Sequence, residues 1–272
     1  ARKAVEDARE RIAASLGADP REILFTSGAT EANNLALAGR AAIVTSAVEH
    51  PSVIEATPRA IRMPVDGAGR VEPAVPDGEI VSVMAANNEV GTLQPIAEIA
   101  MRKGRALLHV DAAQALGKVP VSLDGIDLLT FSAHKIHGPK GIGGLFVRRG
   151  TPLTPQIVGG GQEFGRRAGT ENVALITAFA RAVEVAVRDL ATNAAKMERL
   201  RARLWHGFKS LPDVRVHGHE TERLPSILNI GFEGVEGEAM ILALDAEGVH
   251  VSTGSACASM SLEPSPVLKA MG

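Results

Sequence analysis

Lys135 is the residue of this sequence whose type and position best suit carbonyl chemistry. It follows an apolar run at residues 126–131 and precedes a Gly-Pro pair, so it should lie where a buried strand ends. Burial lowers the pKa of a lysine, and such an amine can form Schiff bases with carbonyl compounds. A solvated surface loop explains the spacing of Lys135 equally well, and it is the better explanation for Lys140.

Asp111 supplies a second chemical group. It follows the apolar run at residues 106–110 and precedes Lys135 by 24 positions, which leaves room for one crossover connection between neighbouring strands. A carboxylate at a buried strand end can keep the ring nitrogen of pyridoxal phosphate protonated, which makes the ring an electron sink. The lysine and the aspartate together therefore suggest a pyridoxal-phosphate site.

The segment at residues 26–34 has the composition of a phosphate-binding loop. It joins a predicted strand at residues 21–25 to a helical pattern, and it contains a glycine and Thr30. Backbone N–H groups at a helix start, together with the Thr30 hydroxyl, can bind an anion. An ordinary Ser/Thr helix cap has the same composition, and only the lysine and aspartate above favour the phosphate.

Strand and helix patterns alternate along most of the chain. This alternation predicts a mostly parallel sheet covered on both faces, with ligand-binding loops at the carboxyl ends of the strands. A long helical pattern then leads into a smaller α/β unit, so we place a large domain at residues 1–189 and a small C-terminal domain at residues 190–272. The predicted strands are residues 21–25, 42–46, 79–84, 106–110, 126–131, 143–148, 226–231 and 249–252. The predicted helices are residues 1–16, 95–101, 173–211 and 238–246, with another starting near Pro51.

The composition of the chain argues against several classes of partner. A net charge of −2 over 272 residues gives no reason to expect a nucleic acid or an anionic membrane. Aromatic residues make up 3% of the chain and tyrosine is absent, which argues against base-stacking surfaces. No apolar run approaches the ~20 residues that span a bilayer. We expect a cytoplasmic protein.

Cys257 is the one cysteine of the chain, which excludes an internal disulfide and a multi-cysteine zinc site. It lies in a small, polar segment at residues 252–259, which favours a reactive thiol over a packed one. His134 and His137 could suggest a metal pair, but no third ligand stands nearby in the sequence. We therefore predict no resident metal site.

Three segments resemble motifs of a known family. HVDAAQALGKV (residues 109–119) and SAHKIHGPKGIGG (residues 132–144) resemble the aspartate and Schiff-base lysine motifs of the class V aminotransferase family. STGSACAS (residues 252–259) is similar to the persulfide-forming loop of its cysteine desulfurases of the NifS/IscS type. The resemblance covers nearly the whole chain. It implies an α/β fold of the fold type I pyridoxal-phosphate architecture, with a mostly parallel sheet of the seven-stranded type in the large domain and a smaller α/β C-terminal domain.

The resemblance also implies roles for individual residues. Lys135 would carry pyridoxal 5′-phosphate and move the Cα proton of L-cysteine. The Cys257 thiolate would then take the sulfur as a persulfide, with release of L-alanine, to supply iron-sulfur cluster or other sulfur-containing cofactor biosynthesis. His50 would stack its ring on the cofactor, although by sequence alone it could also cap a helix. The implied catalytic residues are Lys135, Cys257 and His50. The implied cofactor-binding residues are Ala29, Thr30, His50, Asn88, Asp111, Gln114, Ser132, His134, Lys135 and Thr170.

The resemblance further implies partners for the chain. GRRAGT (residues 165–170) resembles a segment that reaches into the neighbouring subunit's site, where Thr170 would contact the phosphate, so a homodimer is expected. A sulfur-acceptor or iron-sulfur scaffold protein would receive the sulfur, and Cys257 is the residue that would meet a transient iron-sulfur cluster. The alternatives are a selenocysteine lyase or an aminotransferase on the same fold, or a catalytically silent sulfur-transfer scaffold.

Two family motifs have no counterpart in this sequence. They are the Asp-x-x-Ala-Thr-Thr motif that would precede Ala1 and the Arg-x-Ser motif that would follow Gly272. The arginine of the second motif holds the substrate carboxylate in the family. We therefore expect a truncated C-terminal domain, with a consequence for substrate affinity and none for the cofactor chemistry.

Overall fold

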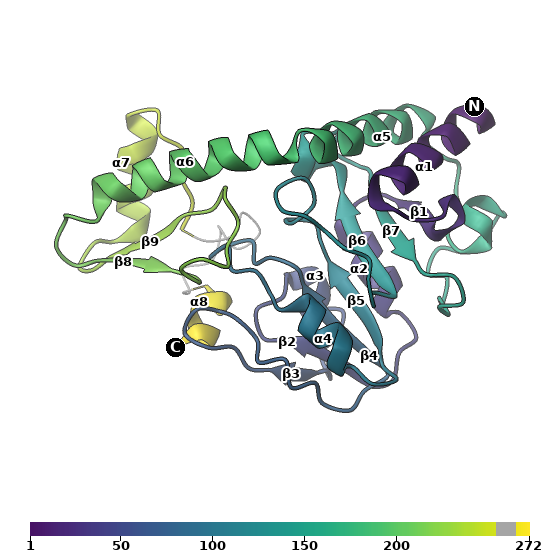
Figure 1. Cartoon of the computed structure of the whole chain (residues 1–272), viewed down its shortest axis with the longest axis horizontal. Coiled ribbons are helices and arrows are strands. Elements are labelled where there is room, and N and C mark those ends of the chain that lie inside the picture. Colours follow the sequence, from purple (N-terminus) through teal and green to yellow (C-terminus); the bar gives the residue numbers. More distant parts are fainter. Residues whose placement is uncertain (254–264) are drawn as a thin grey trace.

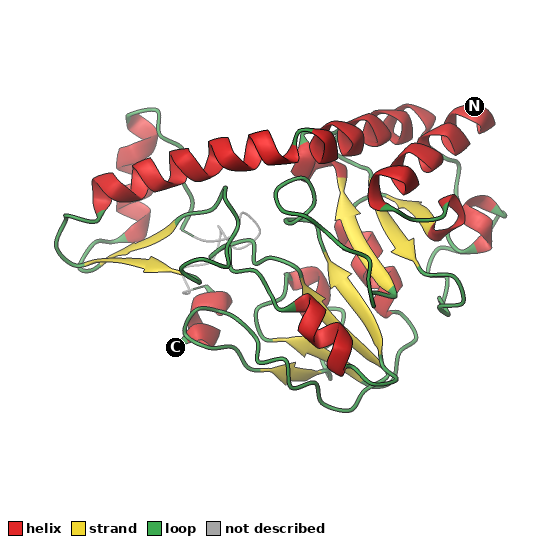
Figure 2. Ribbon diagram, viewed as in Figure 1, coloured by secondary structure: helices red, strands yellow, loops and turns green. Residues whose placement is uncertain are grey.

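The computed structural model describes residues 1–253 and 265–272, and within them the main feature is a seven-stranded sheet (Figures 1 and 2). Its strand order is β1-β7-β6-β5-β4-β2-β3, and among these strands only β7 is antiparallel to its neighbours. The predicted mostly parallel α/β sheet is therefore confirmed. The seven strands are β1 (Ile23–Thr26), β2 (Ile43–Ser46), β3 (Ile61–Met63), β4 (Ile80–Met84), β5 (Leu107–Asp111), β6 (Leu128–Ser132) and β7 (Gly143–Val147).

Helices cover both faces of this sheet (Figure 2). Successive residues of a strand point to opposite faces, so Leu129 of β6 packs with α1, α4 and α5, whereas Leu128 packs with α2 and α3. Because both faces are covered, β4, β6 and β7 are buried along their whole length. The helices are α1 (Arg2–Leu16), α2 (Ala29–Leu37), α3 (Pro51–Ile54), α4 (Ile96–Arg102), α5 (Val173–Arg188), α6 (Leu190–Phe208), α7 (Gly237–Ala246) and α8 (Pro266–Met271). Short 3-10 helices are η1 (Pro20–Glu22), η2 (Ala133–Ile136) and η3 (Gln162–Gly165).

Strand β5 holds the middle position of the sheet. The crossover predicted between residues 111 and 135 places β5 and β6 side by side, with Asp111 opposite Thr130. Strands β2, β4, β5 and β6 run in the same direction, so their carboxyl ends lie at one edge of the sheet. The candidate residues that follow these strands are thereby brought to the same edge.

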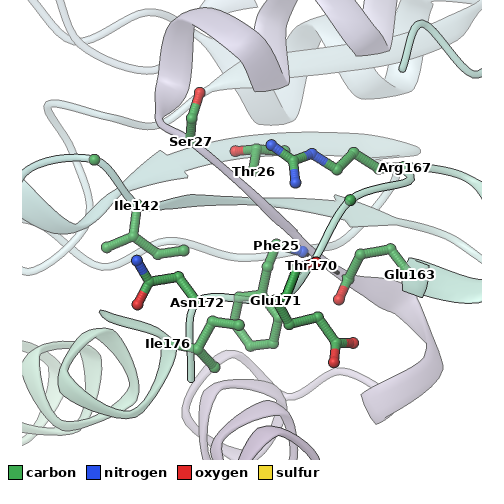
Figure 3. Close-up of a pocket in the computed structure, with 12 residues that line it drawn as sticks. Phe25, Thr26, Ser27, Ile142, Glu163, Arg167, Thr170, Glu171, Asn172 and Ile176 are labelled. Atoms are coloured by element: carbon green, nitrogen blue, oxygen red, sulfur yellow. Dashed lines mark hydrogen bonds between the residues drawn. The ribbon is translucent and has the colours of Figure 1, made fainter. Parts of the chain in front are cut away.

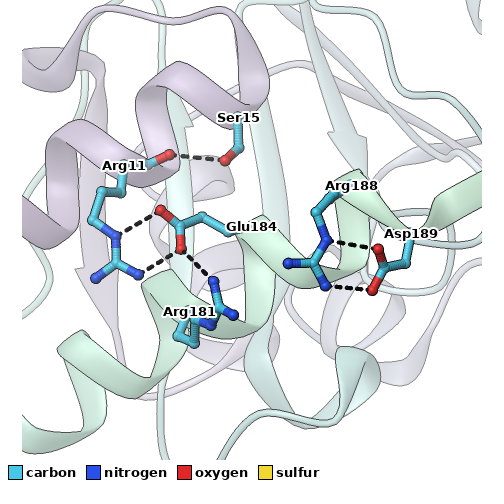
Figure 4. A network of polar contacts seen from close by, with 6 residues as sticks. All are labelled: Arg11, Ser15, Arg181, Glu184, Arg188 and Asp189. Atoms are coloured by element: carbon cyan, nitrogen blue, oxygen red, sulfur yellow. Dashed lines mark hydrogen bonds and ion pairs between the residues drawn. The ribbon is translucent and has the colours of Figure 1, made fainter.

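Helices α5 and α6 run end to end from the sheet to a smaller unit (Figure 1). This unit contains β8 (Val214–His217), β9 (Asn229–Phe232) and α7, and β8 pairs antiparallel with β9. Figure 4 shows a contact that ties α1 to the last turns of α5, where Arg11 donates to Glu184 at 2.7 Å. The predicted helix at residues 173–211 is interrupted at Asp189, which pairs with Arg188. The domain boundary at residue 189 stays a prediction.

Several elements differ from the prediction. Residues 249–252 form no strand, and β8 was missed because four residues of alternating polarity are too short a signal. Helix α2 begins at Ala29, inside the segment at residues 26–34 that was predicted to be a loop. The early start is unexpected because this segment is rich in Asn and Thr. Burial of Ala32 and Asn33 against the sheet outweighs the weak helix propensity of these residues.

A buried ion pair ties α1 and β1 to the loop at residues 159–172. Arg9 is 1% exposed, and its guanidinium donates to both carboxylate oxygens of Glu163 at 2.8 and 2.9 Å. Glu163 also accepts the backbone N–H of Phe25. Glu163 and Phe164 have φ angles of 49° and 58°, which are unfavourable for residues other than glycine. The ion pair and the stacking of Arg9 on the Phe164 ring hold the loop in this conformation.

The helices of residues 1–253 and 265–272 include none that is long and apolar enough to cross a bilayer.

We predict that Glu163→Gln lowers the free energy of unfolding by roughly 3 kcal/mol, because it removes the buried carboxylate that pairs with the Arg9 guanidinium. Urea denaturation followed by circular dichroism measures this change. Asp7→Asn is the matched control, since Asp7 pairs with Lys3 on the surface, and it should barely move the urea midpoint. Equal midpoints for the two variants would contradict a stabilising role for the buried pair.

Candidate active site

Asp111 is a buried carboxylate at the carboxyl end of the central strand β5. It is 6% exposed, and its Oδ1 accepts the backbone N–H of Ala113 at 2.9 Å. Its Oδ2 accepts a hydrogen bond from the Asn33 amide at 2.7 Å. No cation of the described residues forms an ion pair with it. Burial therefore raises the pKa of Asp111, against the opposing effect of its two hydrogen bonds.

Lys135 lies in η2, which begins where β6 ends, as the sequence predicts. Its side chain is exposed, so the expected burial of this lysine was wrong. Ala133 and Ile136 of η2 are buried, whereas His134 and Lys135 between them are exposed, and η2 ends at His137 with a left-handed φ of 62°. Lys135 is nevertheless close enough to His50 and Asp111 for its positive charge to lower the pKa of both groups.

His50 caps the start of α3, which was the alternative left open by the sequence. Its Nδ1 accepts the backbone N–H of Ser52 at 3.1 Å. Burial lowers the pKa of His50, and the charge of Lys135 acts in the same direction against that of Asp111. The structure thus gathers His50, Asp111 and Lys135 at one edge of the sheet. Stacking of the His50 ring on a cofactor stays a prediction.

The start of α2 lies against the end of β6. A Cβ atom at Gly143 would come within 2.7 Å of the Gly28 backbone, so only glycine allows this approach. Gly143 pairs with Ser132 of β6, and the Ser132 hydroxyl lies 2.9 Å from Nδ1 of His134. Gly28 precedes the first turn of α2 and offers no side-chain cap. The N–H groups of this turn and the Ser132–His134 pair are therefore suited to hold one anion.

Gln114 is held by a lysine that the sequence analysis missed. Lys118 donates to the backbone oxygen of Gln114 at 2.9 Å and to its side-chain Oε1 at 3.2 Å. Burial, reinforced by the charge of Lys135, lowers the pKa of Lys118 to about 8. A lysine one helical turn after the glutamine was the available signal, but it is common on any surface.

Asn88 follows a turn built by its neighbour Asn87. The Asn87 amide donates to the backbone oxygen of Val48 at 3.0 Å, and its Oδ1 accepts the N–H groups of Glu89 and Val90. Asn87 is fully buried, whereas Asn88 is half-buried. The turn thus fixes the position of Asn88 at the end of β4.

Thr170 lines a cavity whose lining residues include neither Lys135 nor Asp111. The volume of this cavity is about 140 Å³, and Thr26 and Ser27, which precede α2, line it as well (Figure 3). Arg167 lines the same cavity, and its Nε lies 2.7 Å from Oε1 of Glu31. Cys257 lies outside the described residues. The individual roles expected for the candidate residues stay predictions.

The sequence matches the family described as aminotransferase class-V over residues 1–271. The chain belongs to this family. Curated relatives within it are cysteine desulfurases. Cysteine desulfurase IscS of Dictyoglomus turgidum is 44% identical over 99% of this chain and 75% of its own length. Cysteine desulfurase 1 of Trichormus variabilis is 46% identical over 99% of this chain and 74% of its own length.

Solved structures of class V aminotransferase relatives share this fold. A NifS-like protein superposes with a TM-score of 0.89 at 37% identity, covering 99% of this chain and 78% of its own. DndA from Streptomyces lividans gives a TM-score of 0.86 at 38% identity, covering 99% and 84%. A third neighbour, SspA in complex with cysteine, gives 0.81 at 32% identity, covering 99% and 82%. The predicted membership among the NifS/IscS-type enzymes and the predicted fold are confirmed.

The residues present fit pyridoxal phosphate, the cofactor associated with the class V aminotransferases. The Asp111 carboxylate is buried and lacks a described cationic partner, and a protonated ring nitrogen would supply that charge. The uncapped first turn of α2 suits the phosphate. A lysine amine is available where β6 ends. The same edge of the sheet thus offers Asp111 for the ring nitrogen, the start of α2 for the phosphate and a lysine amine for the Schiff base.

Glu49 is a second buried carboxyl group near this edge of the class V fold. Its Oε1 accepts the backbone N–H of Met84 at 2.8 Å and contacts the Ser46 hydroxyl, while its Oε2 is buried without a partner among the described residues. Burial raises the pKa of Glu49 from its ordinary value near 4.5 to about 8, with the charge of Asp111 acting in the same direction and that of Arg62 opposing it. Burial therefore favours the protonated form of the Glu49 carboxyl group in the folded protein.

We predict that Glu49→Gln makes unfolding less dependent on pH. Between about pH 5 and 8 the folded protein keeps a proton on Glu49 that the unfolded chain loses, so this residue lowers the free energy of unfolding as the pH rises, by about 1.4 kcal/mol per pH unit. Urea unfolding at several pH values measures the slope. Glu55→Gln, at the exposed residue that follows the other end of α3, should keep the wild-type slope. A wild-type slope in Glu49→Gln would rule out this protonation.

Proposed function

We propose that this chain is a pyridoxal 5′-phosphate-dependent cysteine desulfurase, which converts L-cysteine to L-alanine and transfers the sulfur to an enzyme cysteine. One observation supports it above the others: the buried Asp111 carboxylate lies on the strand next to the one that leads into Lys135. Sequence identity to cysteine desulfurases over nearly the whole chain points to this reaction among those of the family.

Each group of the cofactor would be held by a different element. Asp111 would hold the proton of the ring nitrogen, and Gln114, fixed by Lys118, would donate its amide to the ring oxygen. The N–H groups of Ala29 and Thr30, with Ser132 and His134, would bind the phosphate, and Thr170 of the second subunit would add to it. His50 would cover the ring face, and Asn88 would lie beside the ring. Bound in this way, pyridoxal phosphate supplies an electron sink for the bonds at the substrate Cα.

Two residues would carry out the chemical steps, one by proton transfer and one by sulfur transfer. Lys135 would accept the Cα proton of cysteine and later return a proton to carbon. Its exposed amine, at the end of a rigid buried strand, is free to reach a substrate bound over the sheet edge. The Cys257 thiolate would form a bond with the substrate sulfur while the carbon–sulfur bond breaks, which leaves a persulfide on Cys257 and alanine as the product.

The proposed partners follow from the same chemistry. L-cysteine is the substrate, and a sulfur-acceptor or iron-sulfur scaffold protein takes the sulfur from Cys257 in the cytoplasm. A homodimer is supported by the loop at residues 159–172, in which Glu163 is held by Arg9 and Phe164 is exposed, and by the exposed Val158 that precedes this loop. Exposed apolar groups on a fixed loop are typical of a subunit contact.

We predict that Cys257→Ser releases at least about 100-fold less alanine from L-cysteine than the wild type, because a hydroxyl is a far weaker nucleophile than a thiolate. Alanine is measured by chromatography and the persulfide by mass spectrometry. Lys135→Ala is the companion variant, and it should lose covalent trapping of pyridoxal by borohydride, whereas Cys257→Ser should keep it.

Alanine release by Cys257→Ser at the wild-type rate would exclude the thiol as the sulfur acceptor and favour a lyase. Trapping of pyridoxal by Lys135→Ala would exclude Lys135 as the carrier. Cofactor binding without alanine release by the wild type would instead favour a silent scaffold.

A further inference from the structure

A chain of hydrogen bonds joins His50 to Asp111 through two side chains that the mechanism above does not use. The Ser52 hydroxyl, in the first turn of α3, lies 2.8 Å from Nδ1 of His50. The Asn33 amide, on α2, donates to Ser52 Oγ at 2.9 Å and to Asp111 Oδ2 at 2.7 Å. Asn33 is fully buried and Ser52 is 8% exposed, so water competes little for these contacts.

The direction of each hydrogen bond follows from the donors available. The backbone N–H of Ser52 points at Nδ1 of His50, so that nitrogen presents its lone pair and carries no hydrogen. The Ser52 hydroxyl must then donate its single hydrogen to the same nitrogen. Ser52 Oγ is left as an acceptor, which requires a donor from Asn33.

The orientation of the Asn33 amide is fixed by Asp111. The reverse orientation would place Asn33 Oδ1 at 2.7 Å from a carboxylate oxygen, where two acceptors would face each other. With the nitrogen in this position, its two hydrogens serve Ser52 and Asp111. Every hydrogen in this series of hydrogen bonds from His50 to Asp111 is thereby assigned.

We propose that Asn33 and Ser52 are positioning residues that hold His50 as the neutral tautomer with its proton on Nε2 and that orient Asp111 toward its partner. The assignment of His50 and Asp111 to the cofactor rests on the proposed function, but the tautomer does not.

This arrangement has a chemical consequence. A neutral His50 can place its ring or its Nε2–H against a ligand, but its Nδ1 cannot accept a substrate proton. It also adds no positive charge that would compete for the Asp111 carboxylate. The charged groups that act on His50 among the described residues are Asp111 and Lys135, and burial works with Lys135 to keep the ring neutral.

Nitrogen NMR of the full chain labelled with ¹⁵N-histidine tests the proposal, both before and after addition of pyridoxal 5′-phosphate. The chain has eight histidines, so the signals of His50 are assigned by their loss in His50→Gln. At pH 8 we expect an unprotonated Nδ1 and a protonated Nε2. Ser52→Ala should shift the Nδ1 signal toward that of a nitrogen with one donor fewer, and Ser52→Thr should restore it.

Asn33→Ala should shift the same His50 signals and weaken the affinity for pyridoxal 5′-phosphate roughly tenfold, because Asp111 loses one of its two hydrogen bonds. Asn34→Ala is the matched control on the same helix, since its amide donates to the backbone oxygens of Thr30 and Ser52 but to neither the Ser52 hydroxyl nor Asp111. It should leave the His50 signals in place.

A wild-type His50 that carries its proton on Nδ1, or on both nitrogens, at pH 8 would overturn the proposal, whatever the stability of the variants. Folded Ser52→Ala and Asn33→Ala proteins with unmoved His50 signals would also overturn it. The expected tautomer in a protein that makes no alanine from cysteine would uphold the positioning role and refute the desulfurase function instead.

Discussion

The burial of the Asp111 carboxylate is the constraint on which the candidate active site depends. A charged group removed from water is unfavourable by several kcal/mol unless hydrogen bonds and an opposite charge compensate it. Asp111 receives two hydrogen bonds, from Ala113 and Asn33, and no ion pair from the described residues. A cationic ring nitrogen would complete this environment, which is why we propose that Asp111 faces the ring of the cofactor.

The surrounding elements can be understood from that requirement. Asp111 ends the central strand of the sheet, where β4 and β6 exclude water on both sides. Helix α2 serves the site twice, since its uncapped start suits a phosphate and its Asn33 holds the carboxylate. The close approach of Gly28 and Gly143 brings that helix down to the end of β6. In the proposed function, one helix would thereby contact both the phosphate and the carboxylate that faces the ring nitrogen.

Sequence reasoning located the strand ends and the residues that follow them, because burial and glycine punctuation are local signals. The neighbouring positions of β5 and β6, and the residues at their ends, were predicted in this way. Asn33 and Ser52 were missed because their role depends on contacts with Asp111 and with each other across the fold, and Asn33 lies 78 positions from Asp111. The exposure of Lys135 was missed as well, because it depends on which side of η2 packs on the fold, and the buried residues there are Ala133 and Ile136.

The central claim is that Asp111 holds a protonated ring nitrogen. Nitrogen NMR of pyridoxal 5′-phosphate labelled with ¹⁵N in the ring and bound to the full chain measures this directly. We expect a protonated ring nitrogen in the wild type from pH 7 to 8 and an unprotonated one in Asp111→Asn, which removes the negative charge with little change in shape. An unprotonated ring nitrogen in the wild type would contradict the account.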